Sequence, residues 1–455
     1  MPDLSREKLE SGSIPKRVSS EVLRALRRRK PLWKFLETFC RAVEKAGGEL
    51  HLAGGIVRDL VEGRSGKDID LMVAGAGSVG LEMLLGSLPA KRLGIRRILL
   101  VGKAFAVCKV RTTWSDAELD VALARTERST GPGHREFRVR TLNVDAREDA
   151  GRRDFTINSI LFSFRIEKGR LTGRVVDYFG GLADLRRKLI RGVGRAEDRF
   201  REDPLRMMRA IRQKNERSGY SIERKTWAAI RHVAPGLFRT IQAERVIEEL
   251  LRSLAADSGR TVDDLRRAGI LPILLPDLFG IRKDAPARIK RRYAILEKKL
   301  GRPLPENVLL ANLLADFAED ECRSRLREAG RKGRGSGLPK DTRAGDGVLF
   351  RLPRTDGIAH RLHFPKVRSV VRMLEDLGRL HQIRRNRNRH ARVEAIFARW
   401  ETPEPLLALY EAASLAAGRK GSDFLPVLRE AARRPALISG RHLIEMGIPA
   451  GPGME

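Results

Sequence analysis

The sequence has few aromatic residues and almost no cysteine. Of 455 residues, 5% are aromatic and three are cysteine. So few aromatic side chains argue against a surface that binds single-stranded nucleic acid mainly by stacking on its bases. The three cysteines are far apart and form no C-x-x-C pair, which excludes a disulfide framework and a cysteine-based zinc site and fits a reducing cytoplasm.

Long hydrophobic runs are also missing. No apolar segment approaches the length needed to cross a membrane, and residues 1–30 are too polar to form a signal peptide. No amphipathic helix with a basic face and an aromatic edge stands out, so no membrane partner is predicted. We therefore expect a soluble, cytoplasmic protein.

What the chain has in excess is positive charge. It contains 91 Lys and Arg against 58 Asp and Glu, a formal net charge of +33. This exceeds what solubility requires and indicates a polyanionic partner bound through phosphate contacts. The most basic run, residues 379–399, has helical spacing and favours RNA contact, with a solvated helix face as the alternative. A Gly- and Arg-rich stretch, residues 327–347, is predicted to be a mobile loop.

Hydrophobic spacing predicts an α+β chain, with a mixed β-sheet and packed helices followed by helices alone. A helix is expected after Pro31, and another at residues 81–88. Strands are expected at residues 97–102, 105–111 and 118–123, and a hairpin at residues 160–166 and 174–178. Helical periodicity then continues to the end of the chain.

One short segment carries most of the catalytic signal. A short apolar strand leads into Gly54 and Gly55, and a helix containing Arg58 follows. Two glycines let backbone N–H groups approach a phosphate at the start of a helix. Asp68 and Asp70 then fall at strand spacing, so both carboxylates leave one face and suit Mg²⁺. Each pair alone is typical of an ordinary turn or strand edge, but together they predict a nucleoside-triphosphate site that uses metal ions.

Two further segments add polar groups. Asp120 lies in a short apolar strand, expected beside the first carboxylate strand, where it would reach the same metals and help deprotonate an attacking hydroxyl. A solvent-facing strand residue is the alternative. Arg152 and Arg153 can clamp a triphosphate, and Asp154 and Asn158, four apart on one helix face, can hydrogen-bond a ribose. Alternatively, Asp154 is a helix N-cap and the arginines are surface charge.

The last motif predicts base recognition. Asp203 and Pro204 form a good helix start, with the aspartate as N-cap and the proline in the first turn. That interpretation does not account for the arginines that follow three apart, at Arg206, Arg209 and Arg212. A carboxylate acceptor beside an arginine donor fork can hydrogen-bond the edge of a base. A small movement of the pair would change which base is accepted.

With these motifs in order, the sequence resembles the class II tRNA nucleotidyltransferase and bacterial poly(A) polymerase family, of the polymerase beta nucleotidyltransferase superfamily. The four signatures are Gly54-Gly-Ile-Val-Arg-Asp59 with Asp68-Ile-Asp70, Arg152-Arg-Asp-Phe-Thr-Ile-Asn158, Asp177-Tyr-Phe-Gly-Gly-Leu-Ala-Asp184 and Glu202-Asp-Pro-Leu-Arg206. The resemblance covers about residues 46–255.

The resemblance implies that Asp68 and Asp70 hold two Mg²⁺ ions. It implies nucleotide contacts for Gly54, Gly55, Arg58, Arg152, Arg153, Asp154, Asn158, Glu202, Asp203 and Arg206. Arg209, three residues after Arg206, is predicted to contact the nucleotide as well. The predicted parts are a basic lead-in (1–30), a catalytic nucleotidyltransferase head (31–165), a neck that recognises the base (166–256), a helical body (257–375) and a basic helical tail (376–455), with RNA bound by body and tail.

The implied activity is template-independent extension of RNA 3′ ends, with C and A added to tRNA from CTP and ATP and pyrophosphate released. Residues 120–127 and 438–453 look like stretches of CCA-adding enzymes. Residues 100–110 match the poly(A) polymerase signature only in part, since Ala104 replaces a basic residue and no His follows nearby. The alternatives are a poly(A) polymerase, a partial CC- or A-adding enzyme, a catalytically silent RNA-binding protein and nucleotidyl transfer to a small molecule.

Overall fold

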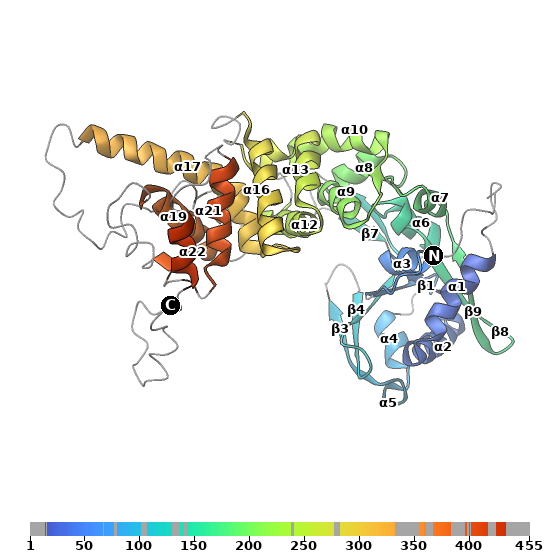
Figure 1. Cartoon of the computed structure of the whole chain (residues 1–455). Helices are drawn as coiled ribbons and strands as arrows, with labels where there is room; N and C mark the ends of the chain where they lie inside the picture. Colours follow the sequence, from blue (N-terminus) through green and yellow to red (C-terminus); the bar gives the residue numbers. More distant parts are fainter. Residues whose placement is uncertain are drawn as a thin grey trace, which may run out of the picture. The chain divides into compact units, whose positions relative to one another are not determined.

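The computed structural model divides into two compact units, Met1–Ile241 and Gln242–Glu455, which are described separately (Figure 1). The structure describes residue 14, residues 16–332 apart from 67, 77–79, 102–106, 130–136, 141–143, 238–240 and 277–282, and residues 355, 357, 359–360, 367–383, 396–397, 400, 402–416 and 425–433. None of the described helices combines the length and the apolar character needed to cross a membrane.

A seven-stranded mixed sheet lies at the centre of the first unit. Its strands are β1 (Glu49–Ala53), β2 (Ile69–Ala74), β3 (Ile95–Val101), β4 (Val107–Thr112), β5 (Leu119–Leu123), β8 (Leu161–Glu167) and β9 (Arg170–Val176). Their order is β3-β4-β5-β2-β1-β8-β9, with β2 and β5 parallel and the other neighbours antiparallel. The predicted α+β class is confirmed, as are the three strands expected between residues 97 and 123.

The predicted hairpin forms, but its second strand starts earlier than expected. β9 begins at Arg170 rather than at residue 174, because Lys168 and Gly169 both adopt positive φ and close a two-residue turn. β8 also pairs with β1, so the hairpin completes the large sheet. The boundary expected between residues 165 and 166 therefore falls inside a strand of this sheet.

Two helices at the start of the chain pack on the sheet, α1 (Lys16–Arg27) and α2 (Lys30–Lys45). The second confirms the helix predicted after Pro31. The first is not predicted, since residues 1–30 are interpreted only as a basic lead-in. Val18, Val22 and Leu26 nevertheless recur every four residues and are buried, which gives α1 one apolar stripe.

The remaining elements of the first unit are short. They are α3 (Gly55–Val61), α4 (Leu81–Gly86), α5 (Ala90–Leu93), α6 (Ala146–Gly151), the 3₁₀ helix η1 (Thr156–Asn158), α7 (Gly181–Arg186), α8 (Ala196–Glu202), α9 (Leu205–Glu216), α10 (Arg224–Val233) and η2 (Ala234–Gly236), with strand pairs β6 (Thr126–Ser129)–β7 (Phe137–Arg140) and β10 (Leu189–Ile190)–β11 (Ser221–Ile222). α6 matters most for the site. Its Ala146 and Ala150 share a buried cluster with Ala53 and Met72, on the face of the sheet that carries Asp70.

The described part of the second unit is helical, as predicted. Its helices are α12 (Ala243–Ala256), α13 (Ser258–Arg267), α14 (Leu271–Leu274), α16 (Ala285–Leu300), α17 (Glu306–Lys332), α19 (Val367–Ile383), α21 (Glu404–Ala416) and α22 (Leu425–Arg433). The loop predicted from residue 327 is wrong at its start, because α17 runs on to Lys332, through the good helix formers Arg327, Glu328 and Ala329 and in spite of Gly330. Residues 333–347, 384–390 and 438–453 lie outside the described residues.

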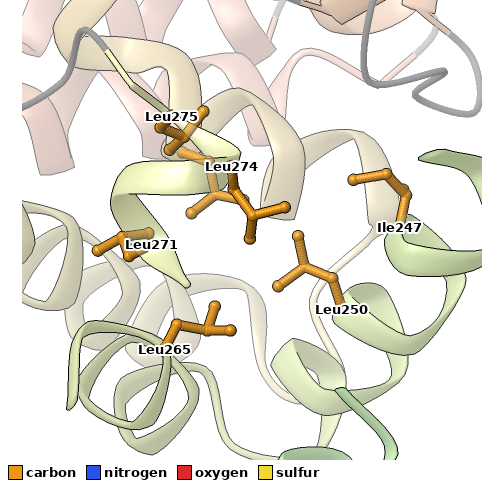
Figure 2. Close-up of a pocket in the computed structure, with 7 residues that line it drawn as sticks. Ile247, Leu250, Leu265, Leu271, Leu274 and Leu275 are labelled. Atoms are coloured by element: carbon orange, nitrogen blue, oxygen red, sulfur yellow. The ribbon is translucent and has the colours of Figure 1, made fainter. Parts of the chain in front are cut away.

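Leucine and isoleucine side chains line a small cavity in the second unit (Figure 2). It is lined by Ile247, Leu250, Leu265, Leu271, Leu274, Leu275 and Leu313. Since no polar side chain lines it, the cavity gives a nucleotide or an ion nothing to bind, and it is a packing void of the helical core.

Candidate active site

Two carboxylates lie side by side in the middle of the large sheet. In the parallel register of β2 and β5, Asp70 pairs with Asp120, and on its other side Asp70 faces Ala53 of β1. The sheet neighbour predicted for the Asp120 strand is thereby confirmed. Asp68 is exposed and precedes β2 by one residue, so the strand itself carries only the second of the two predicted metal ligands.

Gly54 lies directly against Asp70. Its φ of 77° belongs to the left-handed region, and a Cβ added there would lie 2.7 Å from the Asp70 Oδ2 atom. Any larger side chain would therefore both strain the backbone and displace the carboxylate. Gly55 opens α3, where an added Cβ would lie 3.1 Å from Nη2 of Arg58. The predicted glycine turn thus serves first to let the chain approach the carboxylate.

Several charged side chains surround the Asp70 carboxylate. Burial raises the pKa of the Asp70 carboxyl, the positive charge of Arg153 acts against this, and the negative charges of Asp120 and Asp68 raise the pKa further. Carboxylates that repel one another in this way favour a bound cation. Lys109 of β4 supplies one positive charge, since its Nζ donates to Asp120 at 3.1 Å.

These carboxylates are oxygen groups of the kind that can hold a hard metal ion. Within the part of the chain that the structure describes, no three His, Cys, Asp or Glu side chains are already gathered as ligands. Mg²⁺ is usually held by one or two carboxylates, with water and substrate phosphates completing its shell. The pair at Asp70 and Asp120, with Asp68 two residues upstream, offers oxygen ligands of that kind.

Arg58 lies within this region, and its guanidinium is held by protein groups. Nη1 donates to Oδ1 of Asn158 and to Oε1 of Gln213 (3.2 Å), and Nε donates to Asp59 (3.0 Å). Burial lowers the pKa of Arg58, and the nearby charge of Arg217 acts in the same direction. The structure thus brings together Arg58 and Asn158, two predicted site residues, and uses the arginine to join α3, η1 and α9.

Arg152 and Arg153 follow α6, and both contact a residue that no motif singled out. Asp149 accepts hydrogen bonds from Nε of Arg152 and Nη2 of Arg153, each at 2.9 Å. Nη1 of Arg153 also lies 3.6 Å from where a Cβ of Gly54 would be. The pairing could have been found in the sequence, because side chains three and four residues apart meet at a helix surface.

Asp154 and Asn158 are brought together, but not by an α-helix. Asp154 precedes the 3₁₀ helix η1, and its Oδ1 atom accepts from Nδ2 of Asn158 at 2.8 Å. Its Oδ2 atom accepts from Nε of Arg209 at 2.9 Å. The predicted shared face of an α-helix is therefore wrong, although the pair still forms. Arg212 points elsewhere, since its Nη1 atom donates to Glu216 at 2.8 Å.

The Asp154 contacts predict an acid-dependent loss of stability. Burial alone would raise the pKa of Asp154, but the charge of Arg209 and the hydrogen bond from Asn158 lower it to about 2, against an ordinary value of 3.8. A lowered carboxylate pKa stabilises the fold above pH 4 and loses that contribution as the pH falls toward 2. Asp154→Asn should therefore unfold more easily at pH 7, by about 2 kcal/mol.

The stability difference between the parent protein and Asp154→Asn should shrink as the pH falls below about 4. Urea unfolding followed by tryptophan fluorescence from pH 7 to pH 3 measures it, since three of the four tryptophans, Trp33, Trp114 and Trp227, lie in the first unit. A difference that stays constant over this range would contradict the assigned pKa.

The predicted base-recognition residues lie where α8 meets α9. Oδ1 of Asp203 accepts from the backbone N–H of Leu205 at 3.1 Å, and α9 begins one residue later than predicted. Nη1 of Arg206 donates to Glu202 at 3.1 Å and to the carbonyl of Arg199 at 3.3 Å. The Asp203 acceptor and the Arg206 donor fork are thus three residues apart at the start of α9, and Glu202 holds the arginine.

A further ion network joins α3 to the end of α9, and no motif indicates it. Nη2 of Arg217 donates to Asp59 at 2.6 Å, while its Nη1 atom donates to Glu62. The hydroxyl of Tyr220 donates to the same Glu62 carboxylate. The partners are 155 to 158 residues apart, so local spacing gives no signal for them.

Paired carboxylates at a glycine turn, with arginines on the adjoining segments, are the groups that nucleotidyltransferases use to hold a nucleoside triphosphate and metal ions during transfer. A family model described as "Poly A polymerase head domain" matches residues 50–191, and one described as "Probable RNA and SrmB- binding site of polymerase A" matches residues 219–280. The chain is 30% identical over 418 residues to a multifunctional CCA protein of Burkholderia mallei, covering 86% of this chain and 91% of that one. It belongs to the tRNA nucleotidyltransferase and poly(A) polymerase family.

Solved structures share the fold. The CCA-adding enzyme of Thermotoga maritima complexed with tRNA has a TM-score of 0.62 and 17% identity, over 96% of this chain and 91% of that one. The CCA-adding enzyme of Bacillus stearothermophilus in complex with CTP has a TM-score of 0.58 and 23% identity, over 93% and 90%. At these identities the likeness establishes the architecture, and substrates are argued below.

Proposed function

We propose that this protein is a CCA-adding tRNA nucleotidyltransferase, which adds C and A from CTP and ATP to the 3′ end of tRNA and releases pyrophosphate. The observation that carries the proposal is the pair Asp70 and Asp120, held beside Gly54. The relative from Burkholderia mallei, of which the chain covers 91%, is a multifunctional CCA protein. Related folds have been solved with CTP, with ATP and with tRNA.

The proposal includes two Mg²⁺ ions at Asp68 and Asp70. When bound, such ions activate the terminal RNA hydroxyl and screen the charge of the leaving pyrophosphate. Asp120 lies beside Asp70 in the sheet and is proposed to help take up the hydroxyl proton as the oxygen attacks the α-phosphate. Lys109, which donates to Asp120, balances the charge of these carboxylates.

The nucleotide is proposed to lie between the carboxylates and the segments that follow α6. Arg152 and Arg153 are assigned to the phosphates, because a guanidinium matches phosphate oxygens in a bidentate manner. Asp154 and Asn158 are assigned to the ribose, with Arg209 holding Asp154 in place. Gly54 and Gly55, with Arg58 behind them, shape the side of the site nearest Asp70.

Base selection is assigned to the start of α9. Asp203 and Arg206 offer an acceptor and a donor fork, and Glu202 fixes the arginine through a 3.1 Å hydrogen bond. The head, neck, body and tail complete the proposal, with the end of the head moved from residue 165 to the end of β9 at Val176 because the β8–β9 hairpin belongs to its sheet, and with body (257–375) and tail (376–455) binding RNA in the cytoplasm. The net charge of +33 supports a partner of this kind.

The proposal is tested with purified protein, Mg²⁺, tRNA that lacks its 3′ terminus, and labelled CTP or ATP supplied separately. We expect CTP to be incorporated directly, and ATP to be incorporated only after CTP or on tRNA that already ends in CC. Long A tails on unrelated RNA would identify a poly(A) polymerase instead. Incorporation of C without A on tRNA that ends in CC, or of A without C on tRNA that lacks its 3′ terminus, would identify a partial enzyme. RNA binding without incorporation of either nucleotide would identify a catalytically silent protein.

A further inference from the structure

We propose that Asp149 is a positioning residue, which holds Arg152 and Arg153 in the orientation that binds the triphosphate. This inference deepens the proposed function and rests on it, because it takes the site to bind a nucleoside triphosphate. No sequence motif singles out Asp149, and its proposed role as a positioning residue follows from its contacts in the structure.

The Asp149 carboxylate is shared between the two arginines. The side chain is 1% exposed and lies near the end of α6. Its Oδ1 atom accepts from Nε of Arg152 at 2.9 Å and is 2.8 Å from Nη2 of the same residue. Its Oδ2 atom accepts from Nη2 of Arg153 at 2.9 Å. One buried charge therefore fixes two guanidinium groups that would otherwise repel each other.

Asp149 is also tied to the strands that carry the catalytic carboxylates. The backbone N–H of Arg125 donates to its Oδ1 atom at 3.3 Å. One residue earlier, the N–H of Ala124 donates to the carbonyl of Val73 at the end of β2. Since β2 and β5 hold Asp70 and Asp120, the carboxylate fixes the arginines relative to the reacting centre.

Arg153 keeps donor groups for a ligand. Nη1 of Arg153 lies 3.6 Å from the position of a Gly54 Cβ, beside Asp70, and its Nε atom is buried without a hydrogen-bond partner among the described residues. Burial raises the pKa of Asp149, but the charges of Arg153 and Arg152 outweigh this and lower it, so the carboxylate stays ionised at neutral pH. Donors held in place before binding lose less freedom when phosphate arrives.

The second unit contains a comparable cluster, which serves as a control. Asp316 of α17 accepts from Nε of Arg288 at 2.9 Å and from Nη2 of Arg292 at 2.9 Å. There the arginine side chains are 5% and 1% exposed, whereas those of Arg152 and Arg153 are 19% and 18% exposed. The Asp316 cluster is closed inside helices, while the Asp149 cluster remains open to a ligand.

The test compares Asp149→Asn with Asp316→Asn in the full-length protein. Affinity for CTP and ATP is measured by calorimetry without RNA, and KM and kcat are measured with tRNA below both melting temperatures. We expect Asp149→Asn to raise the Kd and KM for the triphosphate by about tenfold and to leave the KM for tRNA unchanged. Asp316→Asn should lower the melting temperature about as much as Asp149→Asn does, because in both variants a buried arginine loses its charged partner. Unlike Asp149→Asn, it should leave the affinity for the triphosphate unchanged.

The results distinguish a positioning role of Asp149 from a purely structural one, and failure of the inference from failure of the proposed function. If the parent protein binds CTP and Asp149→Asn binds it equally well, Asp149 is only structural and the inference is overturned. If the parent protein binds neither CTP nor ATP, the proposed function fails and the inference fails with it. Should Asp149→Asn not fold, Asp149→Glu keeps the charge but displaces both arginines, and it should raise the triphosphate Kd about threefold. An unchanged Kd in that variant would equally overturn the inference.

Discussion

Asp70→Ala should reduce nucleotide addition at least about 10³-fold while leaving the affinity for tRNA within about twofold of the parent protein. The carboxylate pairs with Asp120 across β2 and β5, and it is the proposed ligand of both metal ions. RNA affinity is expected to depend on the basic surface, to which this side chain adds nothing. Asp68→Ala is expected to behave in the same way.

The fold should survive this change. Burial and the neighbouring carboxylates disfavour the charged form of Asp70 by more than Arg153 and Lys109 favour it, so alanine removes a net unfavourable charge. Asp116→Ala is the matched control, since Asp116 is an exposed aspartate in the loop before β5, and its activity should match the parent protein. Primer extension and tRNA binding are measured on all three variants. Full activity in Asp70→Ala would show that the metal assignment is wrong.

Arg206→Ala should lower kcat/KM for CTP and ATP by about 10²-fold and narrow the preference over UTP and GTP to within about tenfold. The reason is that Arg206 is the proposed donor fork, three residues after the Asp203 acceptor at the start of α9 and held by Glu202. A site that hydrogen-bonds the edge of a base loses discrimination when its buried donor is removed.

Arg201→Ala is the control for this prediction. Arg201 lies on the neighbouring helix α8, and its side chain is 54% exposed and pairs with Glu197, so its loss should change none of the four rates by more than about twofold. The measurement is the rate of single-nucleotide addition with each of the four triphosphates. An equal loss for all four in Arg206→Ala would mean that the arginine only joins α8 to α9 and does not select the base.

The sequence predicts best those parts of the site that depend on neighbours in the chain. The turn at Gly54 and the Asp70 strand follow from spacing within about 20 residues, and the Asp120 strand was placed correctly because apolar strands of one sheet pair side by side. By contrast, the ties of Arg217 to Asp59 and Glu62 span more than 150 residues, and no local pattern carries them.

Two local features were missed for different reasons. α1 carries a regular apolar stripe at Val18, Val22 and Leu26, but the arginines around it dominate the composition and hide the stripe. Asp149 stands three and four residues before the arginine pair, which is the spacing of a helical ion pair, and its importance follows from its burial. Burial of a carboxylate is set by tertiary packing, here that of Ala146 and Ala150 on the sheet.

If one site adds C, then C, then A to tRNA, the mass of the intact product will show all three additions. Purified protein is given tRNA lacking its last three nucleotides, together with CTP and ATP, and the RNA is weighed by mass spectrometry after the reaction ends. We expect one product, heavier by two cytidylates and one adenylate, and no further growth. A ladder of added adenylates, or an unchanged mass, would contradict it.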